Sequence, residues 1–180
     1  MSSNAGPMTL SRIWREMSPE QRLAAAGALW ADEDSVPQQV EAVRAIADHL
    51  RSRPQTVVRL PPDRLARHLA SIRTLSESLA SRVLIAYHLA SQRPMLEAFL
   101  GHLGIPNEHG LIKDGVTEAP DPARLSEAVA ALRAAFPPDD VRVYLLTLAA
   151  QDPDTWGALA PIAAGPSSDA TGASSDARPG

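Results

Sequence analysis

Apolar side chains recur every three to four residues along most of this chain, which is the spacing of an amphipathic helix rather than of a strand. The clearest stripes are Val36, Val40, Val43, Ala47 and Leu50, and later Leu125, Val129, Leu132 and Phe136. No segment favours an extended sheet. The pattern predicts an all-α protein of about 7–8 helices, arranged as an antiparallel multi-helix bundle or a short two-layer helical array.

Capping residues mark where several of these helices begin. Ser18 precedes Pro19 and stands three residues before Gln21, so a serine cap with a capping box is expected there. Thr74 or Ser76 opens a longer helix whose second half, 83–87, is apolar almost all round. A helix without a polar face must be buried on every side, so we expect this one at the centre of the domain.

Three segments are less regular. Residues 54–60 combine a proline with two valines and predict a linker or a short helical turn. Pro94 either opens a new helix or kinks the preceding one. Residues 105–120 contain glycine, proline and asparagine with little helical period, so they are expected to form the longest internal loop.

The two ends of the chain are rich in small and polar residues, a composition that cannot bury enough surface to become ordered. We therefore expect a disordered N-terminal tail at 1–8, a single helical domain at 9–162 and a disordered C-terminal tail at 163–180. A domain of roughly 150 residues is large enough to form one hydrophobic core without additional cross-links.

Composition narrows the class of protein. The 180 residues include no cysteine, which excludes disulfides and thiolate metal sites and favours a cytoplasmic location. No apolar run reaches the roughly 20 residues of a membrane span, and the first eight residues lack the pattern of a signal peptide. The net charge of −4 argues against a dedicated nucleic-acid binder. Because 16 of the 17 basic residues are arginine, and alanine and proline are abundant, we infer a GC-rich, bacterial-type genome rather than an arginine-based function.

Four residues are candidate metal ligands: His68, His102, Glu108 and His109. If the helices alternate in direction from Pro37 onward, these side chains converge at one end of the bundle. Imidazole and carboxylate groups bind zinc or iron, and they also transfer protons. Their spacing matches no metal motif, however, and the alternative for each histidine is a surface or helix-capping position. We expect no resident cofactor.

Three helix ends share a local pattern, in His49-Leu50-Arg51-Ser52, His68-Leu69-Ala70-Ser71 and His88-Leu89-Ala90-Ser91. One interpretation is a repeated helical unit with a concave binding surface. The other, which we favour, is that imidazoles and cations suit helix C-termini, where the backbone dipole is negative.

Aromatic residues are scarce, and two of the three tryptophans lie near the ends of the expected domain. Terminal segments with one large aromatic side chain dock onto a partner protein or back onto their own bundle. Trp14, Trp156 and Leu159 are therefore candidate partner-binding residues, and docking onto the same domain is the alternative that we favour. Tyr87 and His88, on the most apolar helix, either line a ligand pocket or belong to the core.

The sequence contains no catalytic, nucleotide-binding or calcium-binding motif, so an enzyme is not expected. The leading hypothesis is a non-catalytic helical module for protein–protein interaction: an adaptor, an accessory subunit or an oligomerising domain that binds a protein partner or itself. The alternative is a helical protein that binds a small ligand or a metal at the bundle end around His102–His109. A nucleic-acid role ranks third, because the basic stretch from Arg51 to Arg67 has no recognition-helix motif.

Overall fold

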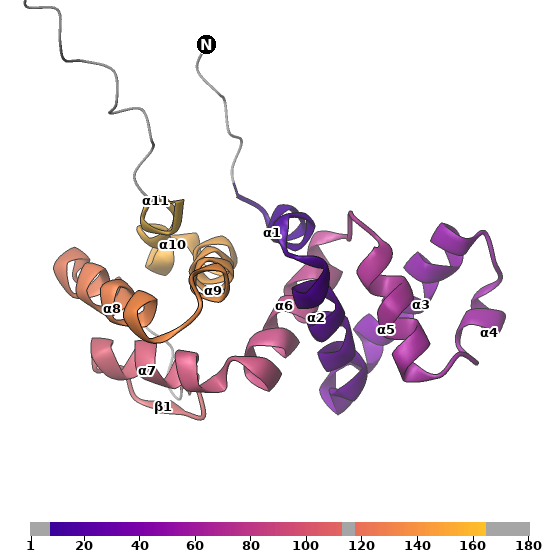
Figure 1. Cartoon of the computed structure of the whole chain (residues 1–180), viewed down its shortest axis with the longest axis horizontal. Helices are drawn as coiled ribbons and strands as arrows, with labels where there is room; N and C mark the ends of the chain where they lie inside the picture. Colours follow the sequence, from indigo (N-terminus) through magenta and orange to yellow (C-terminus); the bar gives the residue numbers. More distant parts are fainter. Residues whose placement is uncertain (1–7, 113–117, 165–180) are drawn as a thin grey trace, which may run out of the picture.

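The computed structural model describes residues 8–112 and 118–164, and most of these residues are helical (Figure 1). The eight longer helices in these ranges are α1 (Leu10–Glu16), α2 (Pro19–Ala31), α3 (Val36–Leu50), α5 (Pro62–Ser71), α6 (Glu77–Ser91), α7 (Arg93–Leu103), α8 (Pro122–Ala135) and α9 (Pro138–Gln151). The shorter ones are the 3-10 helix η1 (Glu33–Ser35), α4 (Pro54–Val57), α10 (Pro153–Trp156) and α11 (Leu159–Ala164). The expected all-α class is confirmed. None of the helices described combines the length and the apolar character needed to cross a bilayer.

Helix α6 joins two groups of helices (Figure 1). In the first group, α1, α2 and α3 pack on α6, α5 packs on α2 and α3, and the short α4 lies against α3. In the second group, α7 and α9 contact α6, α8 packs on α7 and α9, and α10 and α11 lie on α9. The result is an elongated molecule with α4 at one extreme and α8 at the other.

The central position expected for α6 is confirmed, and its sequence explains it. The Ser76 hydroxyl accepts a hydrogen bond from the Leu79 backbone N–H and so caps the first turn. Val83 is fully buried and Tyr87 nearly so, because helices of both groups cover this part of α6. Only Ile85 and Leu89 are left half-buried along its apolar second half.

The expected helix starts are also confirmed. Both hydrogen bonds of the capping box are present: the Ser18 hydroxyl accepts from the Gln21 backbone N–H at 3.1 Å, and the Gln21 side chain accepts from the Ser18 N–H at 3.0 Å. Pro94 lies in the first turn of α7, so it opens a new helix rather than kinking α6. Residues 54–57 form the helical turn α4, one of the two outcomes expected there.

The expectation of a loop without strands at 105–120 is wrong in one detail. β1 (Asn107–Glu108) pairs antiparallel with β2 (Leu111–Ile112) in a tight hairpin. The two residues between the strands, His109 and Gly110, both have positive φ angles, 54° and 82°, which is what a two-residue hairpin turn requires. The glycine of Glu-His-Gly was the available signal, but two-residue strands are too short to show a period.

The described residues extend slightly beyond the expected domain at both ends. Met8 is half-buried and packs against the core, although we expected it in the N-terminal tail. Helix α11 continues to Ala164, and Ala163 is buried, since small apolar side chains let this helix lie close to α9. The remaining residues of the two expected tails, 1–7 and 165–180, lie outside the described residues, as do 113–117 of the loop.

The hairpin turn yields a test of the fold. A Cβ atom at Gly110 would lie 2.6 Å from the Cβ of Leu96, and the positive φ disfavours any side chain there. We therefore expect Gly110→Ala to lower the free energy of unfolding by about 2 kcal/mol. The control is Gly27→Ala in the middle of α2, where a Cβ meets no atom within 4 Å. It should raise stability by up to about 1 kcal/mol. Urea denaturation of both variants measures the difference, and a Gly110→Ala protein as stable as the wild type would contradict the packing of the hairpin on α7.

Candidate functional site

The structure does not bring the four candidate metal ligands together. His68 lies on α5 in the first group of helices, whereas His102, Glu108 and His109 lie on α7 and the hairpin in the second group (Figure 1). The His102 ring contacts the Ala98 carbonyl one turn earlier at 2.8 Å, and His109 lies 3.6 Å from the Glu97 carboxylate. Within 8–112 and 118–164, no group of three or more His, Asp or Glu side chains is placed to share a metal ion.

The three candidate partner-binding residues are buried in the protein's own core. Trp14 is fully buried, and its indole N–H donates to the Ile72 carbonyl at 2.9 Å. The Trp156 ring packs 5.9 Å from the Phe99 ring, and Leu159 is fully buried. Their placement corresponds to docking onto the same domain, so we do not assign them to a partner surface.

An apolar cavity of about 270 Å³ lies where α6, α7, the hairpin and α9 meet. We call it the His88 cavity. Its wall consists of Ile85, His88, Leu89, Leu96, Leu100, Gly110, Leu111, Ile112, Tyr144, Thr147, Leu148 and Gln151. No residue of this wall carries a formal charge at neutral pH. The polar groups in it come from one histidine, one tyrosine, one threonine and one glutamine.

His88 is buried and held as a neutral imidazole. The Thr147 hydroxyl donates to the Val143 carbonyl at 2.7 Å, so its oxygen is left to accept from His88 Nε2, 3.2 Å away. This assignment puts the ring proton on Nε2 and leaves Nδ1 with a lone pair. Nδ1 is buried and has no hydrogen-bond partner among the described residues. Burial lowers the pKa of His88 to about 3, against a smaller opposing effect of the Asp140 charge.

Tyr144 supplies the second polar group of the cavity wall. Its ring meets the His88 ring edge-on at 5.4 Å and the Phe99 ring at 5.6 Å. Burial raises the pKa of the Tyr144 hydroxyl, so the phenol stays protonated. No hydrogen bond joins this hydroxyl to another residue in the part of the chain that the structure describes. It is therefore a donor and acceptor that the fold itself does not use.

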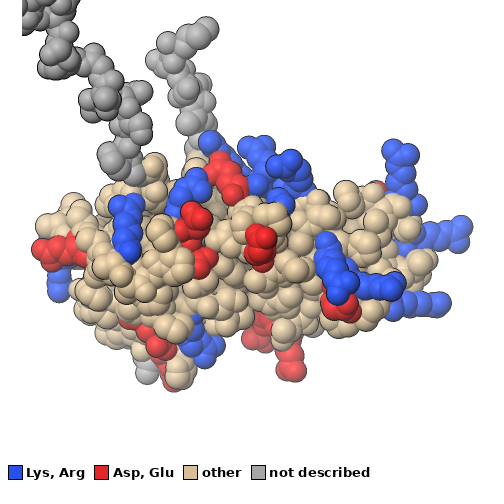
Figure 2. Space-filling model, in the orientation of Figure 1, with Lys and Arg blue, Asp and Glu red and all other residues tan. Residues whose placement is uncertain are grey.

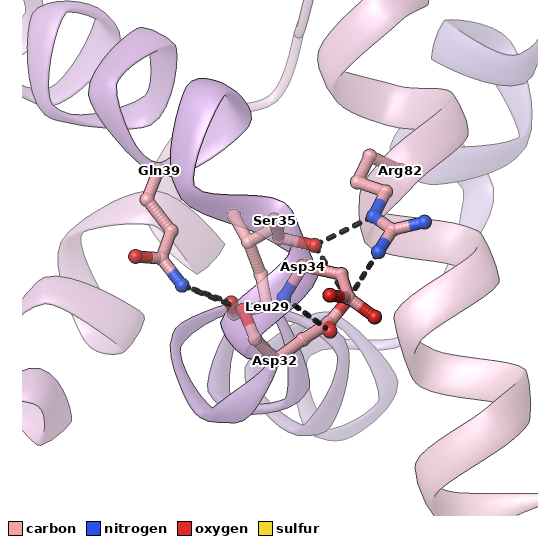
Figure 3. A network of polar contacts seen from close by, with 6 residues as sticks. All are labelled: Leu29, Asp32, Asp34, Ser35, Gln39 and Arg82. Carbon is pink, nitrogen blue, oxygen red and sulfur yellow. Dashed lines mark hydrogen bonds and ion pairs between the residues drawn. The ribbon is translucent and has the colours of Figure 1, made fainter.

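A second, more polar hollow adjoins the cavity and shares Ile85, Leu89 and Leu111 with it. Its polar side is the network of Figure 3, in which Arg82 of α6 holds the turn between α2 and α3. The Arg82 guanidinium lies 2.7 Å from the Asp32 carboxylate and donates to the buried Ser35 hydroxyl at 2.6 Å. The hydrogen bond from Ser35 is the main reason that the pKa of Asp32 is lowered. Since these groups satisfy one another, we interpret the network as structural.

Only part of the cavity wall could be predicted from the sequence. Tyr87 and His88 were the candidates for a ligand pocket, and of this pair only His88 lines the cavity. Tyr87 belongs to the core, with its hydroxyl donating to Asp140 at 3.1 Å. Tyr144 and Thr147 were missed because they lie more than fifty residues further along the chain, on a helix that reads simply as apolar. A threonine inside such an apolar stretch was the one available signal.

The neutral His88 predicts how stability depends on pH. An unfolded chain takes up a proton at this histidine as the pH falls below its ordinary pKa, whereas the folded protein does not. The wild type should therefore lose about 2 kcal/mol of folding free energy between about pH 7 and pH 5 from this group alone. The lowered pKa values of Glu16 and Asp32 act below this interval. In His88→Phe, which keeps an aromatic ring against Tyr144, this loss should disappear.

Urea unfolding at the two pH values measures the effect. The control is His49→Phe, which removes an exposed histidine from α3 and should keep the acid sensitivity of the wild type. If His88→Phe loses as much stability on acidification as the wild type does, the imidazole is not held neutral in the folded protein.

Comparisons of this chain with models of protein families, with curated proteins and with solved structures found no match. The His88 cavity combines an apolar wall, a neutral imidazole and a phenol without a hydrogen-bond partner among the described residues.

Proposed function

We propose that the protein binds a small, uncharged and mostly apolar molecule in the His88 cavity. The observation that carries the proposal is a cavity of about 270 Å³ whose wall is apolar apart from a few polar groups and has no charged residue. Such a combination is typical of ligand pockets, in which apolar side chains supply affinity and a few polar groups fix orientation. A ligand-binding protein was the alternative expected from the sequence, but the proposed site lies beside α6 and α9 rather than around His102–His109.

The cavity wall favours a neutral ligand. Placing a charged group in an apolar site costs several kcal/mol unless an opposite charge is present. His88 cannot provide one, because burial keeps its pKa at about 3. The Tyr144 phenol is likewise uncharged, since burial raises its pKa. A carboxylate or an ammonium group would therefore be bound less well than its neutral counterpart.

The volume and the polar groups of the His88 cavity restrict the kind of ligand further. An apolar cavity of about 150 Å³ in another protein accommodates benzene, so this larger cavity has room for a substituted ring or a short branched chain. Two polar groups of the wall are available to it, the Tyr144 hydroxyl and the exposed Gln151 amide, because Nδ1 of His88 is fully enclosed and the Thr147 hydroxyl is occupied. We expect one hydroxyl or carbonyl group on the ligand to pair with Tyr144.

A series of matched probes tests this function. Thermal unfolding with toluene, p-cresol and benzoate compares an apolar ring with the same ring carrying a neutral hydroxyl or a charge. The expected order of stabilisation is p-cresol, then toluene, with benzoate giving none. Leu89→Trp should abolish the stabilisation because the indole fills the cavity. Leu23→Trp, at an exposed position of α2 outside the cavity wall, should leave it unchanged. Equal stabilisation by benzoate, or the absence of any response to the three probes, would exclude the proposed ligand class.

The leading hypothesis from the sequence, a protein-interaction module in a cytoplasmic setting, also stays a proposal, and it depends on a different part of the molecule. Trp14 and Trp156 are buried, so they offer no surface to a partner protein. The exposed apolar side chains that favour it lie at the arginine-rich end formed by α3 and α4.

A further inference from the structure

Exposed apolar side chains are concentrated at one end of the molecule. Six large apolar side chains are exposed among the described residues, and four of them fall within 36–58: Val36, Val40, Leu50 and Val58. Val58 is 60% exposed and Val40 49% exposed. Valine side chains of a small helical domain are normally covered, so this concentration marks a surface on which something else can pack.

Two of the exposed valines, Val40 and Val58, line a single hollow together with the buried Val43. Val40 and Val43 of α3 face Pro54 and Val58 across it, and Arg44 and Gln55 complete the wall. Val36 lies one helical turn before Val40 and so shares its face of α3. We call this the α3–α4 surface and include in it the neighbouring exposed arginines: Arg44, Arg51, Arg53 and Arg59.

The charge around this surface is opposite to that of the whole chain. Residues 36–73 contain seven arginines and three acidic residues, a net charge of +4, in a chain whose total is −4. Figure 2 shows basic side chains projecting from the end of the molecule where α4 lies. Two of the three acidic residues are occupied, because Asp63 pairs with Arg67 at 3.2 Å and Glu41 accepts from the Ser76 hydroxyl. Among the described residues, Arg44, Arg51, Arg53 and Arg59 have no carboxylate partner.

One of these arginines, Arg51, has a backbone conformation that suits glycine better. It ends α3 with φ 51° and ψ 41°, the left-handed conformation in which glycine is the usual residue. A longer side chain there carries a conformational cost and supplies no ion pair within the described residues. The cost is understandable if the guanidinium acts on a partner.

We propose that the α3–α4 surface binds an acidic segment of a partner protein that carries aliphatic side chains on one face. The valines and Pro54 would receive the aliphatic side chains, and the four unpaired arginines would meet carboxylates at the rim. This site is separate from the His88 cavity, so either proposal can fail without the other.

Three other occupants fit less well. A second copy of this chain has an acidic remainder, but its only other exposed large apolar residues among those described are Leu23 and Leu111. Single-stranded nucleic acid is bound by aromatic stacking, and residues 36–73 contain no Phe, Trp or Tyr. Membrane-inserting surfaces project Trp, Phe or Leu, whereas the apolar side chains that line this hollow are valines and a proline.

A displayed library of random peptides, selected against the full-length protein, tests the proposal directly. The selected peptides should be rich in Asp and Glu, with aliphatic residues at helical or alternating spacing. Their affinity, measured by fluorescence anisotropy, should fall about tenfold in Val58→Ser and about threefold in Arg51→Gly. Arg51→Gly should also unfold at the same or a higher temperature than the wild type, so a loss of binding there cannot come from a weaker fold.

Leu23→Ser and Arg124→Gln are the matched controls, because both residues are exposed and lie outside the α3–α4 surface. Both should bind the selected peptides as the wild type does. Selection without an acidic bias, or binding that Val58→Ser and Arg51→Gly leave unchanged, would overturn the proposal. The same would follow if no peptide were enriched while vesicles of phosphatidylserine bound the wild type and not Val58→Ser, since the occupant would then be a membrane.

Discussion

The burial of α6 is the constraint on which the rest of this structure depends. A helix that is apolar almost all round can persist in water only when neighbours cover it on every side. Helices of both groups supply this cover. The cover is incomplete along Ile85 and Leu89, and the His88 cavity and the adjoining polar hollow both open on that strip. The proposed binding site is thus the part of the central helix that packing leaves partly bare.

The helices could be predicted from the sequence because their signals are local. Ser18 with Gln21, Ser76, and the prolines of the first turns determine where helices begin within a few residues, and the three-to-four spacing determines which face is buried. Helix packing could not be predicted in the same way. Helices α5 and α7 belong to different groups, which keeps His68 away from His102, and no local pattern encodes which helices pack together. The hairpin was missed because two paired residues are too few to produce a periodic signal.

The candidate site illustrates the same limit. His88 stood out in the sequence as a polar residue on an apolar helix, but its partner Thr147 lies 59 residues further along the chain. Only the fold shows that the Thr147 hydroxyl is committed to a backbone carbonyl and therefore determines which imidazole nitrogen carries the proton. The chemistry of the cavity depends on the tertiary structure. The positive charge of the α3–α4 end, in contrast, is visible in the sequence as a cluster of arginines. The helical stripe predicts burial for the valines that accompany this cluster, and their exposure is again a tertiary result.

The sharing of one helix by both groups has a consequence for the evolution and dissection of this protein. α6 contributes core residues to each group, so the chain has no point near its middle at which it can be divided into two self-sufficient modules. A fragment that ends before α6 lacks the surface on which α1 and α2 pack. A fragment that ends directly after α6 exposes the apolar side chains of α6 that the second group covers. The molecule is therefore expected to unfold as one cooperative unit despite its two-part appearance.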